Sequence, residues 1–208
     1  MLRYIFANDL DQYPRLRDTM FCDRADQFKA RLGWDVSVNA SGEERDEYDA
    51  LNPLYVIWQG PDGRHGGSMR LLPTTGRVMV NEHFGHLTGG KVIADPEIWE
   101  CTRFCLARGA APNVAGALML AGGEVMRGFG ITQYVGVFDA RMVRIYRMIG
   151  ASPTIIGSIG EGRDQISVGL WGFSDASRLR VAQRAGLSPE ISKLWFRRAV
   201  GATSALSA

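Results

Sequence analysis

Residues 97–107 read EIWECTRFCLA, and they are followed by VAGALMLAGGEVMRGF at 114–129 and ITQYVGVF at 131–138. Aromatic and β-branched residues enrich the first and third stretches. The middle stretch is rich in Ala, Met and Leu and ends before Gly130. This order predicts a strand, a helix and a second strand.

On either side of this unit the sequence predicts further alternating elements. We expect a strand at 2–7, a helix at 14–31, a hairpin with strands at 54–59 and 67–73, a helix at 139–150, a hairpin over 154–171, and one or two short helices after it. The pattern predicts the α/β class, as a three-layer α/β/α sandwich around a mixed sheet.

Composition limits the class of protein. We expect the 208 residues to form a single domain, 1–208, with a small-residue tail frayed from about residue 200. A net charge of +2 does not predict a nucleic-acid partner. The amino terminus does not look like a signal peptide, and no stretch is apolar enough to span a membrane. Three sparse cysteines, Cys22, Cys101 and Cys105, are typical of reduced thiols, so we expect a cytoplasmic protein.

One unusual feature is a helix face that carries Arg17, Phe21, Arg24 and Phe28, followed by Trp34. The spacing of four, three and four residues places the first four side chains on one side of the helix. Both phenylalanines can belong to the core while the arginine stems extend past them to water. The alternative is a functional site that uses arginines and aromatic rings together.

Two further features are charged. Asp46 and Asp49 lie three residues apart in an acidic loop, either as solvated charges or as carboxylates that organise arginines or face a cationic ligand. Arg70 lies within an apolar strand, where its guanidinium must reach a carboxylate, a cleft or water.

The last feature is the pair Glu100 and Arg103, which a regular strand would place on opposite faces. If both charges serve one cleft, the strand needs a β-bulge or a twist. We predict that irregularity near Cys101 or Thr102.

Together these positions resemble the LuxI-type acyl-homoserine lactone synthases, the autoinducer synthase family. The resemblance rests on matched residues in the family's order, and it covers about residues 24–150: Arg24, Phe28, Trp34, Asp46, Asp49, Arg70, Glu100 and Arg103, followed by Phe104. It implies a fold similar to the GCN5-type N-acetyltransferases, in which two strands of the sheet splay to admit a pantetheine arm.

The resemblance also implies the reaction, in which an acyl chain is transferred to the amine of S-adenosylmethionine and the lactone then closes, for quorum sensing. S-adenosylmethionine is a substrate, and neither cofactor nor metal is expected. The implied catalytic set is Glu100, as base, with Arg103, Arg70, Asp46 and Asp49. Arg24, Phe28, Trp34, Arg103 and Phe104 are the expected binding residues for S-adenosylmethionine.

The expected acyl donor is acyl carrier protein, with acyl-coenzyme A as the alternative. Arg141, Arg144 and Arg147 lie three apart on one predicted helix and suit an acidic partner, although an ordinary solvated face has the same pattern. The stretch RGAAPNVAGALM lacks the Arg/Gln-x-x-Gly-x-Gly/Ala loop with which acetyltransferases of this fold hold coenzyme A pyrophosphate.

We expect the acyl pocket to include Leu118, Met119, Gly136, Met142 and Met148, although for each residue taken singly the core is the favoured interpretation. Gly136 offers no hydroxyl to a 3-oxo group, which favours an unsubstituted or 3-hydroxy chain. Two other functions stay open: an acyl-coenzyme A N-acyltransferase acting on another amine, and a non-catalytic sensor of a nucleoside-like ligand.

Overall fold

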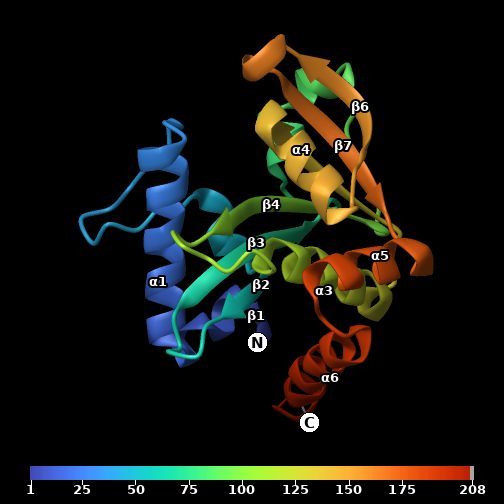
Figure 1. Ribbon diagram of the computed structural model, residues 1–208. Coiled ribbons are helices and arrows are strands. Elements are labelled where there is room, and N and C mark those ends of the chain that lie inside the picture. Colours follow the sequence, from blue (N-terminus) through green and yellow to red (C-terminus); the bar gives the residue numbers. More distant parts are fainter. Residues whose placement is uncertain (207–208) are drawn as a thin grey trace.

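The computed structural model describes the backbone of residues 1–206 and the side chains of residues 1–201 (Figure 1). Within that part the strands are β1 Leu2–Phe6, β2 Leu54–Gln59, β3 His65–Pro73, β4 Ile98–Leu106, β5 Gln133–Asp139, β6 Thr154–Ile159 and β7 Ile166–Gly172. The helices are α1 Pro14–Ala25, α2 Met79–Glu82, α3 Val114–Phe129, α4 Ala140–Ile149, α5 Asp175–Ala185 and α6 Pro189–Leu206. Shorter turns of helix are η1 Ala7–Gln12, η2 Asp26–Arg31, η3 Glu47–Leu51, η4 Gly85–Thr88 and η5 Gly162–Asp164.

The strands form a single mixed sheet in the order β1-β2-β3-β4-β5-β7-β6. Every neighbouring pair is antiparallel except β4 and β5, which run parallel. That parallel pairing is short, because it joins Ile98–Glu100 to Gln133–Val135 and does not continue along either strand. Beyond Glu100 the two strands separate, as the resemblance to the N-acetyltransferases implies.

Helices cover both faces of the sheet, which confirms the three-layer α/β/α architecture (Figure 1). On one face α1 packs its buried Leu16, Met20 and Phe21 against Tyr55 and Ile57 of β2. On the other face α3 and α6 cover the first half of the sheet. In the second half of the sheet, α4 packs Tyr146 against the aromatic rings of Phe138 on β5 and Trp171 on β7.

The predicted elements are present, with two local differences. The expected helix over 14–31 is α-helical only to Ala25 and continues as the π-helical segment η2. The tail expected to fray from about residue 200 contains the end of α6, which runs to Leu206, while residues 207 and 208 lie outside the described part. None of the described helices is both long and apolar enough to cross a membrane.

The packing of η4 on β6 generates a prediction. A Cβ atom added to Gly157 of β6 would lie 1.7 Å from the carbonyl oxygen of Leu87, which is backbone and cannot rotate away. Gly157→Ala should therefore lower the free energy of unfolding by about 1–3 kcal/mol, measured by urea denaturation. Gly172→Ala on neighbouring β7 is the matched control, because nothing lies within 4 Å of its added Cβ. Equal stability of the two variants would contradict the packing.

Candidate functional site

A cavity of about 1010 Å³ lies where β4 and β5 separate. Residues 101–104 of β4 line one side and residues 136–138 of β5 line another. The segment η2 contributes Phe28, with Trp34 shortly after it, while α3 and α4 contribute apolar side chains such as Met119 and Met142. The cavity thus has a charged and aromatic end near the amino-terminal segment and an apolar end at α3 and α4, next to arginines of α4 and α5 such as Arg147 and Arg180.

Behind the charged end lies a network of buried ion pairs. The Arg24 side chain is 0% exposed, and its Nε donates to Glu44 Oε2 at 2.6 Å. Its two terminal nitrogens donate to the two oxygens of Asp49 at 3.0 Å each. Arg70, also 0% exposed, donates to Asp49 Oδ1 at 2.7 Å and contacts Asp46. Each acid therefore holds an arginine that has no access to water.

Arg103 closes the network on the cavity side. Its Nη2 lies 3.0 Å from Glu44 Oε1 and 2.8 Å from Asp46 Oδ2. The network thus comprises equal numbers of guanidinium and carboxylate groups: Arg24, Arg70, Arg103, Glu44, Asp46 and Asp49. Burial alone would raise the pKa of Asp49, but the Arg24 and Arg70 guanidiniums hold it well below its ordinary value.

A β-bulge turns Arg103 toward this network. Ser68 of β3 pairs with Cys105 and Arg70 pairs with Thr102, so two residues of β4 face only one residue of β3. Arg103 itself has a φ of +51°, in the left-handed region that residues with a Cβ rarely adopt. The predicted irregularity is confirmed, one residue beyond the predicted place. Glu100 and Arg103 line one cavity.

The Glu100 carboxylate lies at the base of the cavity and is 1% exposed. Its oxygens accept the backbone N–H groups of Met79 at 3.0 Å and Val80 at 2.6 Å, which are the first two residues of α2. Burial raises the pKa of Glu100 to about 7, in spite of these two hydrogen bonds. The group is therefore suited to exchange a proton near neutral pH.

Aromatic rings form the outer wall at the charged end. Phe28 and Trp34 stack with ring centroids 5.0 Å apart and an angle of 18° between planes. Phe28 is buried, whereas Trp34 is 36% exposed, and the Arg103 guanidinium lies 5.4 Å from the centre of the Phe28 ring. A cation–π contact and an exposed indole can hold a flat or positively charged ligand at this end.

The sequence matches the family model described as autoinducer synthase over residues 8–181. The chain belongs to this family. Curated acyl-homoserine-lactone synthases include one from Rhizobium etli, 40% identical over 178 residues that cover 82% of this chain and 84% of the relative. One from Agrobacterium fabrum is 36% identical and covers 71% of this chain and 78% of the relative.

Solved structures agree on the fold of this autoinducer synthase. The synthase LasI superposes with a TM-score of 0.75 at 26% identity, covering 88% of this chain and 94% of LasI. The CoA-dependent synthase MesI superposes with a TM-score of 0.79 at 24% identity, covering 90% of this chain and 96% of MesI. An N-acetyltransferase from Lactobacillus plantarum superposes with a TM-score of 0.52 at 18% identity, covering 83% and 99%, which supports the predicted likeness of fold.

The predicted site residues of the synthase fall into two groups, those that line the cavity and those that lie behind its wall. The cavity itself is lined by residues from both of the predicted sets, namely Phe28, Trp34, Glu100, Arg103 and Phe104. The other four residues of the two sets are not among the described residues that line the cavity. They form the network behind Arg103: Arg24, Asp46, Asp49 and Arg70. We therefore expect these four to position Arg103 and β4 rather than to contact substrate.

Three of the five residues predicted for the acyl pocket lie at the cavity. Met119, Gly136 and Met142 line the cavity. The prediction is wrong for Leu118, which is fully buried in the core between α3 and the sheet. It is also wrong for Met148, which lies in the last turn of α4 with 65% of its surface exposed. The spacing of these residues along the predicted helices did not distinguish the lining of the cavity from the core or from the exposed surface.

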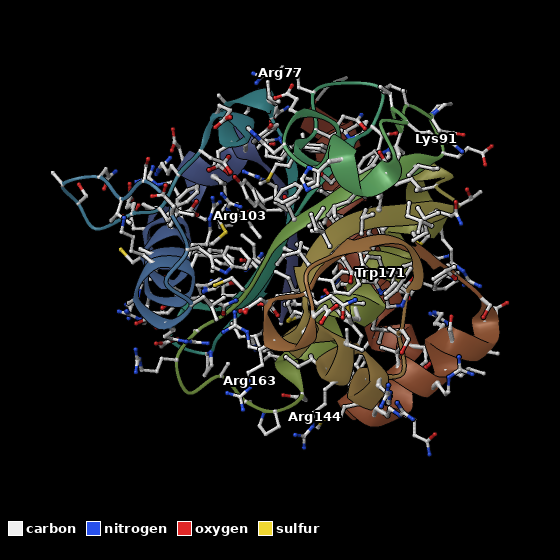
Figure 2. All side chains as sticks on the ribbon, turned by 90° about the horizontal axis from the view of Figure 1, so that it is seen from above. Arg77, Lys91, Arg103, Arg144, Arg163 and Trp171 are labelled. Atoms are coloured by element: carbon white, nitrogen blue, oxygen red, sulfur yellow. The ribbon has the colours of Figure 1, made fainter. Side chains whose placement is uncertain are left out.

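The three arginines of α4 are all exposed, but they do not form one free patch. Arg141 pairs with Asp139, the residue that caps the start of α4, at 2.6 Å. Arg147 lines the cavity, and Arg144 lies at the edge of the molecule, away from Arg103 (Figure 2). Only Arg144 and Arg147 therefore remain available to an acidic partner from the predicted set.

Sequence reasoning missed four contributors to the site. Glu44 was part of the acidic loop but was not singled out, and Tyr55 donates its hydroxyl to Asp49. Met79 places its sulfur 3.5 Å from Arg70 Nη2 and 3.7 Å from Arg103 Nη1. Gln27 binds the backbone of β4. The alternation of Glu44 with Asp46 was a usable signal, whereas nothing in the sequence indicated Gln27.

The network generates a prediction about stability. Asp49→Asn removes the charge that faces both Arg24 and Arg70, so it should lower the free energy of unfolding by about 3–5 kcal/mol at pH 7. Because the folded pKa of Asp49 is depressed, this contribution is present above its ordinary pKa of 3.8 and is lost as the pH falls further. Urea denaturation at pH 7 and pH 3 measures both effects.

The matched control is Asp11→Asn. Asp11 also pairs with an arginine, Arg17, but its side chain is 84% exposed. Its loss should change stability by no more than about 0.5 kcal/mol. If Asn at position 49 cost as little as Asn at position 11, the buried network would not stabilise the fold.

Proposed function

We propose that this synthase transfers an acyl chain from acyl carrier protein to the α-amine of S-adenosylmethionine and then closes the homoserine lactone. The observation that carries the proposal is the cavity itself. Its charged, aromatic end suits a sulfonium nucleoside, and its apolar end suits an acyl chain. The splayed strands between the two ends offer a place for the thioester.

At the charged end, the Phe28–Trp34 stack suits the positively charged sulfonium and the flat adenine. Arg103, 9% exposed, is the network arginine that lines the cavity, so it is our candidate to bind the substrate carboxylate. A solved neighbour of 24% identity, BjaI, is described with S-adenosylmethionine and isopentyl-CoA, and another of its structures contains MTA. This lends support to the same substrate here.

In the first step the α-amine nitrogen attacks the thioester carbonyl carbon. A carbon–nitrogen bond forms, the carbon–sulfur bond breaks with its electron pair going to sulfur, and the carrier leaves as its thiolate. The amine proton passes to Glu100, and since both Glu100 oxygens already accept amides of α2, we assign one bridging water to this transfer. In the second step a carboxylate oxygen of the substrate attacks its own γ-carbon, and neutral methylthioadenosine leaves as the carbon–sulfonium bond breaks.

At the apolar end we assign Met119, Gly136 and Met142 to the acyl chain. Gly136 lies where the strands begin to separate, and a Cβ added there would be 2.9 Å from the carbonyl oxygen of Cys101. A side chain at this position would therefore narrow the gap. The absence of a hydroxyl at Gly136 continues to favour an unsubstituted or 3-hydroxy chain.

The proposal also assigns the acyl donor, which we take to be acyl carrier protein. Exposed Arg144 and Arg147 suit the acidic surface of a carrier protein. The loop between β4 and α3 lacks the glycine pattern that holds coenzyme A pyrophosphate. Because the neighbours MesI and BjaI are CoA-dependent, acyl-coenzyme A is the alternative that the assay must include.

The test is to incubate the protein with S-adenosylmethionine and a panel of acyl-carrier proteins and acyl-coenzyme A thioesters. We expect homoserine lactones and methylthioadenosine in equal amounts by mass spectrometry, with the carrier-protein donors faster. Lactone from coenzyme A thioesters alone would overturn the assigned donor. Acylation of a different amine, or binding of methylthioadenosine without turnover, would overturn the proposed reaction.

The raised pKa of Glu100 generates a second prediction. If the deprotonated carboxylate accepts the amine proton, kcat should rise with pH and level off above about pH 7. Glu100→Gln should lower kcat about 100-fold or more and remove this pH dependence. A merely structural role in holding α2 would be indicated by a Gln variant that keeps the wild-type pH profile.

A further inference from the structure

Gln27 connects the π-helical segment η2 to the edge of β4. Its side-chain Nε2 donates to the carbonyl oxygen of Phe104 at 2.9 Å, and its Oε1 accepts the backbone N–H of Leu106 at 2.9 Å. The side chain is half-buried and lines the cavity. One amide thus satisfies two backbone groups that lie two residues apart on a strand.

The edge that Gln27 binds is the one that faces away from β3. Cys105 pairs with Ser68 of β3, and the N–H of Ala107 donates to Gly66. The backbone groups of Phe104 and Leu106 must therefore point to the opposite edge, where β5 would continue if the strands did not separate.

The geometry repeats that of a parallel strand. In a parallel pair, one residue donates its N–H to the carbonyl of residue i−1 and accepts from the N–H of residue i+1 of its neighbour. Gln27 makes the same two bonds around Cys105. Its carboxamide stands in for the N–H and C=O of one residue of the missing strand.

We propose that Gln27 is a positioning residue for the bound S-adenosylmethionine, an inference that rests on the proposed function. By tying η2 to β4, it fixes the adjacent Phe28 over Arg103, and with it the Phe28–Trp34 stack. It also occupies the backbone groups of β4 that follow the bulge. The reacting amine and thioester therefore meet at residues 101–103. Arg31 adds only a long contact, 3.4 Å, to the Leu106 carbonyl.

The first test is Gln27→Ala. Loss of two hydrogen bonds that hold the wall of the site should raise KM for S-adenosylmethionine about 10-fold, while kcat falls less than about 3-fold. Hydrogen exchange of the Leu106 amide, followed by mass spectrometry, should become faster. Gln183→Ala is the control, because Gln183 is an exposed α5 residue and should leave KM, kcat and this exchange unchanged.

The second test, Gln27→Glu, keeps the size of the side chain and separates positioning from folding. An ionised carboxylate can accept from Leu106 but repels the Phe104 carbonyl, whereas the protonated acid can make both bonds. The ratio of variant to wild-type KM should therefore fall toward one as the pH is lowered from 7 to 4, through the ordinary pKa of a glutamate of about 4.3. A ratio that stays constant across this range overturns the proposal, even if Gln27→Ala does not fold.

The outcomes separate this inference from the proposed function. If the wild-type protein consumes no S-adenosylmethionine with any donor, the proposed function fails. In that case unchanged exchange of the Leu106 amide in Gln27→Ala would overturn the strand-like contact independently of activity. If the wild type is active and Gln27→Ala keeps its KM, only the positioning role is overturned.

Discussion

The active end of this synthase depends on one constraint: three guanidinium groups are buried, and each must be matched by a carboxylate. Arg24 comes from α1, Arg70 from β3 and Arg103 from β4, while the acids come from the loop before η3 and from its first turn. No one of these segments is stable in its place without the others, since an unpaired buried charge is costly. The network therefore joins a helix, two strands and a loop into one wall.

The same constraint explains the irregular backbone of β4. A regular strand would direct Arg103 away from Glu100, and the positive φ at Arg103 has an energetic cost. Pairing with Glu44 and Asp46 offsets that cost and holds the guanidinium at the cavity. The parallel pairing of β4 with β5 already ends at Glu100, before the bulge, so the bulge and Arg103 lie on the part of β4 that borders the opening.

Local sequence was enough to predict most of the architecture and the need for a bulge. Two opposite charges in EIWECTRFC could serve one cleft only if the alternation of the strand failed, and it fails at Arg103. Partners contributed by distant segments were not predictable. Glu44 alternates with Asp46 in the acidic loop, but neither Glu44 nor Gln27 has a pattern that indicates a contact with β4, because a single side chain reaching across space leaves no pattern along the chain. Leu118 and Met148 fail for a related reason, since helical spacing does not reveal which face meets a cavity.

Charge balance within the network also limits what the site can recognise. Three arginines and three acids sum to no net charge, so the wall neither attracts nor repels a ligand strongly as a whole. Recognition at this end must come from groups that line the cavity, among them the Arg103 guanidinium, the Glu100 carboxyl and the Phe28–Trp34 stack. A substrate that carries a sulfonium, an amine and a carboxylate close together presents a separate partner to each of them. A simple anion or a simple cation would satisfy only one, which favours a zwitterionic ligand at this end of the cavity.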